Sequence, residues 1–155
     1  IRMLTLRRVV LPLLNAGMER LTITNRTAEK AHALAAMIAQ TVPAVGQRLQ
    51  SRALPQLAGE RFDIVINATS TSLNNETPAL PEGVFAPGSL AYDMVYGQGA
   101  TPFLQHAMAH GAARCSGGLG MLVEQAAESF FLWRGIRPQT QPVMEMLRRQ
   151  LDEPG

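Results

Sequence analysis

Short apolar runs typical of β-strands alternate with helical stretches along nearly the whole chain, and this order constrains the fold more than any other feature. Strands are predicted at residues 1–6, 21–24, 45–49, 62–67, 90–95 and 113–116. Helices are predicted at residues 9–15, 28–40, 101–110, 118–134 and 142–151, with a short helical turn at 55–57. Strands and helices that alternate through short connections favour parallel strands joined by right-handed crossovers. The sequence therefore predicts an α/β fold, a doubly wound and mainly parallel sheet with helices on both faces.

The spacing of apolar residues predicts which faces of these elements are buried. In the helix at 28–40, the residues three and four apart are Ala31, Leu34, Ala35 and Ile38. In the helix at 118–134, the same spacing predicts a buried stripe of Leu119, Leu122, Val123, Ala126 and Phe130. The run at 62–67 is strongly apolar, as expected of a parallel strand that is covered on both faces.

Length and composition limit the class of protein. The 155 residues suit a single domain, 1–155, with its own hydrophobic core. Because the chain begins at Ile1 within a predicted strand, we expect residues to be missing upstream. The longest apolar runs are too short to span a bilayer, and no signal peptide is recognisable. A single cysteine, Cys115, rules out an internal disulfide and predicts a cytoplasmic protein.

Charge and histidine placement exclude two further classes of site. Basic residues are scattered and aromatic residues make up 5% of the chain, which predicts no nucleic-acid partner. The three histidines, His32, His106 and His110, have no cysteine or carboxylate at metal-ligand spacing. We therefore expect no metal site. We also expect no membrane partner and a monomer or homodimer in solution.

A polar tetrapeptide, Thr24 to Thr27, ends the second predicted strand. At this position of a doubly wound fold an acid binds the ribose hydroxyl of NAD, whereas an arginine accommodates the 2′-phosphate of NADP. No acid stands here; Arg26 offers a planar guanidinium, Asn25 and Thr27 can donate hydrogen bonds, and Lys30 follows one helical turn later. Thr27 also begins a helix whose free N–H groups favour an anion. The pattern favours NADP, although a capped helix with a solvated Arg26 would explain the same residues.

Three other clusters follow predicted strands or begin a helix. Residues 67–70 (Asn-Ala-Thr-Ser) could pass beside a cofactor or form a generic loop. In residues 93–96, Met94 could lie against a nicotinamide ring and Tyr96 could reach a polar substrate, or both could fill the core. Asp93 is expected to be a buried structural acceptor rather than a base. The glycines at 117–120 allow either close approach to a ligand or tight packing of a helix start on the sheet.

Taken together, six segments resemble the C-terminal half of shikimate dehydrogenases, in the family's order and over nearly the whole chain. They are residues 9–14, 23–27, 63–70, 92–96, 101–104 and 118–125. The resemblance implies a Rossmann-like domain of an oxidoreductase that interconverts shikimate and 3-dehydroshikimate with NADP in aromatic amino-acid biosynthesis. The helices in 118–155 would then face a substrate domain that this chain lacks.

The family's functional residues are carried over to matching positions. The resemblance implies that Asn25, Arg26, Thr27 and Lys30 hold the 2′-phosphate, with Lys30 where many members have arginine. The cofactor would be lined by Ala68, Thr69, Met94, Gly118 and Met121. Tyr96 and Gln125 would contact shikimate, while Gly117 stands where the family often has aspartate. No catalytic residue is assigned, because the family's catalytic Lys-Asp pair belongs to the N-terminal domain.

The family's glycine-rich pyrophosphate loop should follow the first strand, yet Leu6 continues directly into Arg7. We therefore expect that Leu6 and Arg7 are not true neighbours and that this loop belongs between them. Two alternatives stay open: a quinate/shikimate dehydrogenase that also accepts NAD, and a non-catalytic Rossmann-like remnant used for binding or association.

Overall fold

The computed structural model describes residues 2–69 and 77–152, which form two compact units. Unit 1 comprises Ile1–Arg61 and Pro78–Val84, and unit 2 comprises Phe62–Thr77 and Phe85–Gly155. All strand pairs in both units are parallel among the described residues, which confirms the predicted α/β class. None of the helices in the described ranges combines the length and apolar content needed to cross a membrane.

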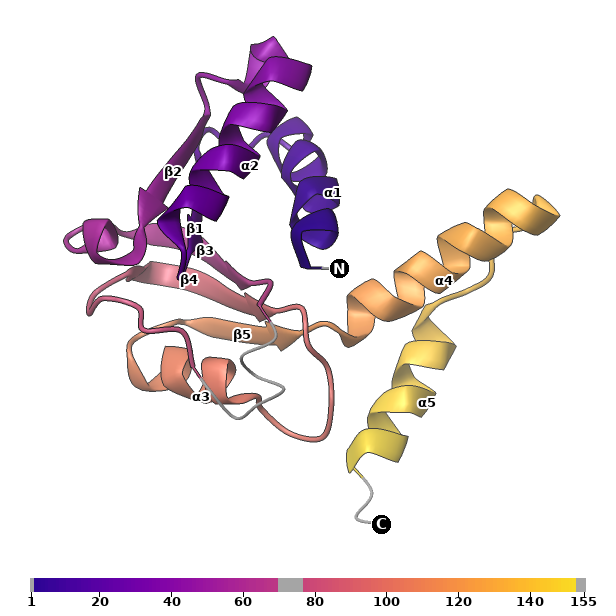
Figure 1. The fold of residues 1–155 in the computed structure, drawn as a ribbon. Coiled ribbons are helices and arrows are strands. Elements are labelled where there is room, and N and C mark those ends of the chain that lie inside the picture. Colours follow the sequence, from indigo (N-terminus) through magenta and orange to yellow (C-terminus); the bar gives the residue numbers. More distant parts are fainter. Residues whose placement is uncertain (1, 70–76, 153–155) are drawn as a thin grey trace. The chain divides into compact units, whose positions relative to one another are not determined.

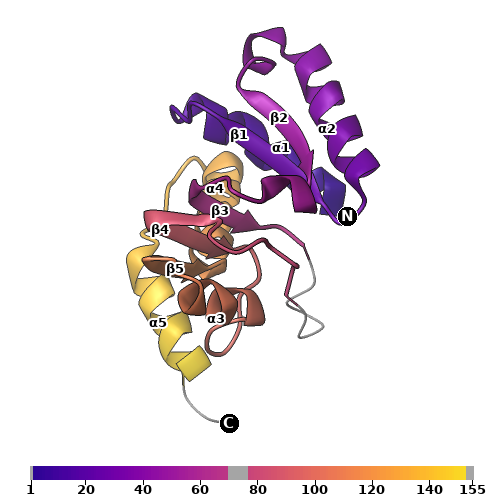
Figure 2. The same cartoon turned by 90° about the vertical axis from the view of Figure 1, so that its left-hand side faces the viewer.

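Unit 1 contains two helices and a two-stranded parallel sheet (Figure 1). Its elements are α1 (Arg2–Asn15), β1 (Leu21–Asn25), α2 (Ala28–Thr41), η1 (Pro43–Val45), β2 (Leu49–Ala53) and η2 (Leu54–Leu57). The strands pair from Leu21 opposite Leu49 to Asn25 opposite Ala53, and α2 lies along them (Figure 2). The core is made of Val10, Leu14, Ile23, Ala31, Leu34, Ala35, Ile38, Val45 and Leu49. The four apolar residues predicted to face the core from α2 are thus confirmed.

The start of the chain differs from expectation. Residues 2–15 form one unbroken helix, so the strand predicted at 1–6 is wrong. The predicted break between Leu6 and Arg7 is wrong too, because α1 runs through both. A short apolar run does not by itself distinguish a strand from a helix, and nothing between Arg2 and Leu11 breaks a helix. α1 ends near Gly17, whose φ of 97° an L-residue rarely adopts.

Unit 2 contains a three-stranded parallel sheet in the order β3-β4-β5. Its elements are β3 (Phe62–Asn67), β4 (Phe85–Asp93), α3 (Pro102–Ala109), β5 (Arg114–Gly117), α4 (Leu119–Arg134) and α5 (Gln141–Asp152). The three strands end in one row, since Asn67 pairs with Asp93 and Asp93 with Gly117. α3 packs on β4 and β5 through the buried Phe103, Leu104 and Ala107. The carboxyl ends of the three strands therefore lie side by side at one edge of the sheet. Ligands bind at this edge in doubly wound parallel sheets.

Two strand boundaries shift for local reasons. The strand predicted at 45–49 instead runs from Leu49 to Ala53, because Pro43 begins a 3₁₀ turn that ends at Val45. β4 ends at Asp93 rather than Val95, since the N–H of Val95 donates to the Asp93 carboxylate instead of to a neighbouring strand.

Two burial predictions are wrong. β3 is not covered on both faces, because Asp63 is exposed and Ile64 is 42% exposed. In α4, only Val123 of the predicted stripe is buried; Leu122 and Phe130 are 36% and 44% exposed. Figure 1 shows the reason: α4 extends away from the end of β5, and α5 folds back beside it. Helical spacing identified an apolar face but not what covers it.

Candidate cofactor-binding site

The carboxyl end of β1 is built as a tight turn into α2. The Asn25 side-chain oxygen accepts a hydrogen bond from the Thr27 N–H at 3.0 Å, which aligns the chain for the helix. Thr27 occupies the N-cap position as predicted, but its side chain makes no capping hydrogen bond. The N–H of Lys30 donates to the Thr27 backbone oxygen at 3.1 Å. The N–H groups of Ala28 and Glu29 have no acceptor within the helix, so they stay available to an external one.

Exposed positive charge surrounds this helix start. Arg26, Thr27 and Lys30 are all exposed, and within the described residues neither Arg26 nor Lys30 forms an ion pair. One acid, Glu29, lies in the same turn. A guanidinium, an ammonium and free helical N–H groups within five residues of one another suit a phosphate group.

In unit 2 a buried carboxylate lies at the carboxyl end of the central strand, β4. Asp93 is fully buried and accepts hydrogen bonds from Asn67 Nδ2 at 3.2 Å, from Val95 N–H at 3.1 Å and from the Thr101 hydroxyl at 2.6 Å. Thr101 caps α3, where it accepts from the N–H of Leu104. The prediction that Asp93 is a buried structural acceptor is confirmed.

The segment after β3 is ordered by Asn67. Its side-chain oxygen accepts from both the N–H and the hydroxyl of Thr69, at 3.0 and 2.7 Å. Its backbone oxygen accepts from the N–H of Met94 at 3.0 Å. Ala68, Thr69 and Met94 are partly buried there, while Ser70 of the same predicted cluster lies outside the described residues.

The glycine at the start of α4 is required by packing. Gly118 is buried, and its N–H donates to the Val95 oxygen at 3.1 Å. A Cβ at this position would lie 2.3 Å from the Met94 oxygen, far inside van der Waals contact. Close packing of the helix start on the sheet, one of the two interpretations of this glycine, thus accounts for it. Met121, in the first turn of α4, is partly buried.

A pocket of about 310 Å³ opens beside this edge of unit 2. Its polar lining comprises Tyr92, Tyr96, Thr101, Ser116 and Arg148. Burial raises the pKa of the Tyr92 phenol, and a hydrogen bond from the Met121 backbone partly offsets the effect. The lining has one cation and no acid among the described residues, which suits a small hydroxylated anion.

Of the two residues predicted to contact the substrate, only one lines this pocket. Tyr96 lines the pocket and is 48% exposed, whereas Gln125 lies on α4 and is not part of the lining. Sequence reasoning missed Tyr92, Ser116 and Arg148. Thr101 could have been found, since threonine before a proline is a recognisable helix start.

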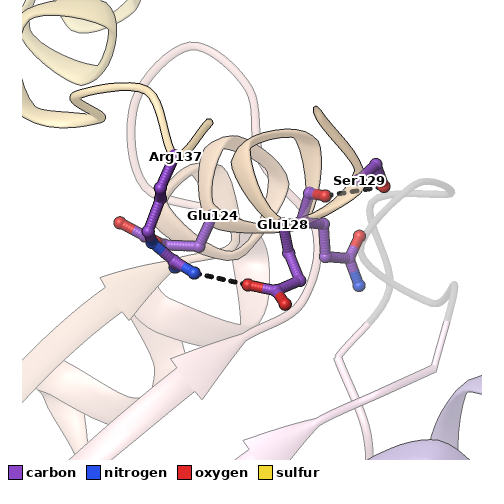
Figure 3. A network of polar contacts seen from close by, with 5 residues as sticks. Glu124, Glu128, Ser129 and Arg137 are labelled. Atoms are coloured by element: carbon purple, nitrogen blue, oxygen red, sulfur yellow. Dashed lines mark hydrogen bonds and ion pairs between the residues drawn. The ribbon is translucent and has the colours of Figure 1, made fainter. Parts of the chain in front are cut away.

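The face of α4 that carries Gln125 is tied to the segment after the helix. Arg137 forms ion pairs with Glu128 and, at 3.2 Å, with Glu124, one turn apart on α4 (Figure 3). Glu128 is the main cause of the raised pKa of the Arg137 guanidinium. The Ser129 hydroxyl donates to the Gln125 backbone oxygen at 2.9 Å.

Two family models match the sequence. The one described as shikimate/quinate 5-dehydrogenase matches residues 5–79, and the one described as the shikimate 5′-dehydrogenase C-terminal domain matches residues 118–148.

Curated relatives and solved structures agree with these matches. The shikimate dehydrogenases (NADP⁺) of Aromatoleum aromaticum and Nitrosospira multiformis are 56% and 54% identical over 94% and 96% of this chain. The chain spans about half the length of these relatives, 52% of each. An Ael1 enzyme from Pseudomonas putida has a TM-score of 0.78 at 45% identity, over 94% of this chain and 50% of its own.

A shikimate 5-dehydrogenase from Thermus thermophilus, solved with NADP(H) and shikimate, has a TM-score of 0.69 at 31% identity, over 90% of this chain and 49% of its own. With family models matching near both ends and relatives more than half identical along 94% of its length, the chain belongs to the shikimate dehydrogenase family.

Proposed function

We propose that this chain is the cofactor-binding half of an NADP-dependent shikimate dehydrogenase, which interconverts shikimate and 3-dehydroshikimate. The observation that carries the proposal is the start of α2, where Arg26 and Lys30 are exposed and unpaired among the described residues beside free helical N–H groups. The names of the relatives support the choice of NADP and of shikimate.

The proposal assigns the residues by ligand group. Asn25, Arg26, Thr27 and Lys30 hold the 2′-phosphate of NADP. The nicotinamide end is lined by Ala68, Thr69, Met94, Gly118 and Met121. Tyr96 and Gln125 contact shikimate. When bound, NADP would supply the hydride acceptor for the substrate alcohol, and the role of these residues is to bind and orient the two molecules.

The assignment extends to the chain as a whole. Residues 1–155 serve as one NADP-binding domain, and the helices within 118–155 face the substrate domain of the complete protein. The lone Cys115 and the lack of an apolar span in the sequence support a cytoplasmic location.

The test compares two cofactors that differ only in the 2′-phosphate. Charge-assisted hydrogen bonds contribute about 1.5 to 3 kcal/mol, so Arg26→Ala should weaken NADPH binding roughly ten- to a hundredfold. NADH affinity should hardly change. Isothermal titration calorimetry on the 155-residue chain measures both dissociation constants.

Arg20→Ala is the matched control, because Arg20 is also exposed but precedes the opposite end of β1. It should leave both affinities unchanged. Equal losses for NADPH and NADH in Arg26→Ala would contradict the assignment of the 2′-phosphate. Absence of saturable binding of either cofactor to the wild-type chain would favour the non-catalytic remnant instead.

A further inference from the structure

One carboxylate joins three segments at the edge of the unit 2 sheet. Asp93 has no exposed surface, and it accepts hydrogen bonds from the end of β3, from the segment after β4 and from the start of α3. These segments are separated in sequence, and the hydrogen bonds to Asp93 bring all three to one side chain.

Two of these segments carry residues assigned to the nicotinamide end. Asn67, which donates to Asp93, fixes Thr69 through two hydrogen bonds and Met94 through a third. Val95, which also donates to Asp93, follows Met94 directly and accepts from Gly118 at the start of α4. Loss of the carboxylate would therefore remove the acceptor that orients the Asn67 side chain, which holds Thr69, and the acceptor of the Val95 N–H, next to Met94.

We propose that Asp93 is a positioning residue for the nicotinamide end of NADP(H), acting through Asn67 and Val95 on Thr69 and Met94. The inference rests on the proposed function. A buried carboxylate that accepts several charge-assisted hydrogen bonds holds its donors more rigidly than neutral groups would. This preorganisation lowers the cost of ordering the binding residues when the cofactor arrives.

The experiment uses NADPH and its adenosine fragment 2′,5′-ADP, which carries the 2′-phosphate but no nicotinamide. Asp93→Ala should weaken NADPH binding by about tenfold or more, the size expected for the loss of one charge-assisted hydrogen bond. The affinity for 2′,5′-ADP should stay unchanged. Both dissociation constants are measured by calorimetry on variants whose circular dichroism spectrum matches the wild type.

Two controls separate positioning from general loss of stability. Phe103→Leu truncates a fully buried side chain of α3 that has no hydrogen bond to Asp93, so it should destabilise the chain without changing either affinity. Asp63→Ala makes the same chemical change at an exposed position of β3 and should also change neither. A loss of NADPH affinity in Phe103→Leu as large as in Asp93→Ala would overturn the inference.

If Asp93→Ala does not fold, Asp93→Asn decides the question. The amide can keep the bonds from Asn67 and Val95 but cannot accept at both of its terminal atoms, so a smaller loss of NADPH affinity, about threefold, is expected. Wild-type NADPH affinity in folded Asp93→Asn would overturn the inference. Failure of the wild-type chain to bind 2′,5′-ADP would instead contradict the proposed function, which keeps the two failures distinguishable.

Discussion

At the scale of single residues, Gly118 and Gly120, which closely follow β5, differ in what surrounds them. A Cβ on Gly118 would lie 2.3 Å from the Met94 oxygen, so Gly118→Ala must push backbone apart. Overpacking of this kind costs about 1 to 3 kcal/mol of the free energy of unfolding. We expect Gly118→Ala to lower it by that amount, as measured by urea denaturation, and to weaken NADPH binding through Met94.

Gly120→Ala is the matched comparison, because Gly120 lies in the first turn of the helix that Gly118 caps. Its Cβ would make an ordinary contact, 3.6 Å from the Met144 sulfur. Alanine is favoured over glycine by up to about 1 kcal/mol in a helix interior, and by less in the first turn, where Gly120 lies, so this variant should be as stable as the wild type or slightly more so. A stable Gly118→Ala, or equal losses in both variants, would contradict the close-packing explanation.

The residues of the candidate site were predictable where the signal is local. Asn25, Arg26 and Thr27 follow a strand and begin a helix within a few positions, so their proximity needed no tertiary information. Asp93 could be predicted as a buried acceptor because a lone carboxylate at the end of an apolar strand needs donors. Arg148 could not be placed beside Tyr96, because 52 positions separate them in the sequence and no periodicity links α5 to the sheet.

At the scale of elements, type was easier to predict than burial. The lengths of the segments that became α2 and α3, and the residues that end them, predicted helices clearly. Both helices begin and end within one residue of the predicted positions. The run at 1–6 was misread because its six residues carry no helix or strand period of their own. The stripe on α4 was misread because an apolar face predicts a partner surface without identifying it, and the element that mainly packs against α4 in unit 2 is α5.

A pH effect is expected from the last turn of α3. The rings of His106 and His110 stack with centroids 3.9 Å apart, and burial, with a smaller contribution from His110, lowers the pKa of His106 below 6.5. The unfolded chain therefore binds a proton at His106 more readily than the folded chain does. Stability should be retained above pH 6.5 and should fall as the pH drops through the lowered pKa.

His106→Gln removes this titration. The free energy of unfolding of the variant, measured by urea denaturation from neutral pH to well below 6.5, should decline less steeply than that of the wild type. Parallel pH profiles for the two proteins would show that His106 does not titrate differently on folding.

A third prediction concerns the segment after α4. Arg137 is about half exposed, as are Glu124 and Glu128, so their ion pairs are screened by water. Arg137→Gln should therefore lower the free energy of unfolding by little more than the scatter of the measurement. A larger loss in thermal denaturation at physiological salt would mean that Arg137 fixes the turn into α5 through more than surface charge.

At the scale of the whole molecule, the parallel α/β class followed from the order of elements, whereas the division into two units did not. Alternating strands and helices predict parallel pairing, but they contain no information about which strands share a sheet. The register that places Asn67, Asp93 and Gly117 side by side depends on the bulge between Phe62 and Ile64 and on the long β4. Neither feature leaves a periodic pattern in the sequence. The chain also spans only half of its relatives' length, so its function has to be tested on the chain as it stands.

We expect the 155-residue chain to bind NADP without oxidising shikimate. Transfer of a hydride from an alcohol needs a group near the hydroxyl that takes up its proton. The described residues that line the pocket include no histidine, lysine, aspartate or glutamate, and Gln125 has no group that could serve as the base. With saturating shikimate and NADP, absorbance at the NADPH band should not rise above a blank.

Binding of NADPH, measured by calorimetry in the same preparation, shows that the chain is folded and competent, and the full-length relative from Aromatoleum aromaticum provides the positive control. Turnover at an ordinary enzyme rate, about 1 per second or more, would mean that a proton acceptor lies within these 155 residues and that the assignment of no catalytic residue is wrong.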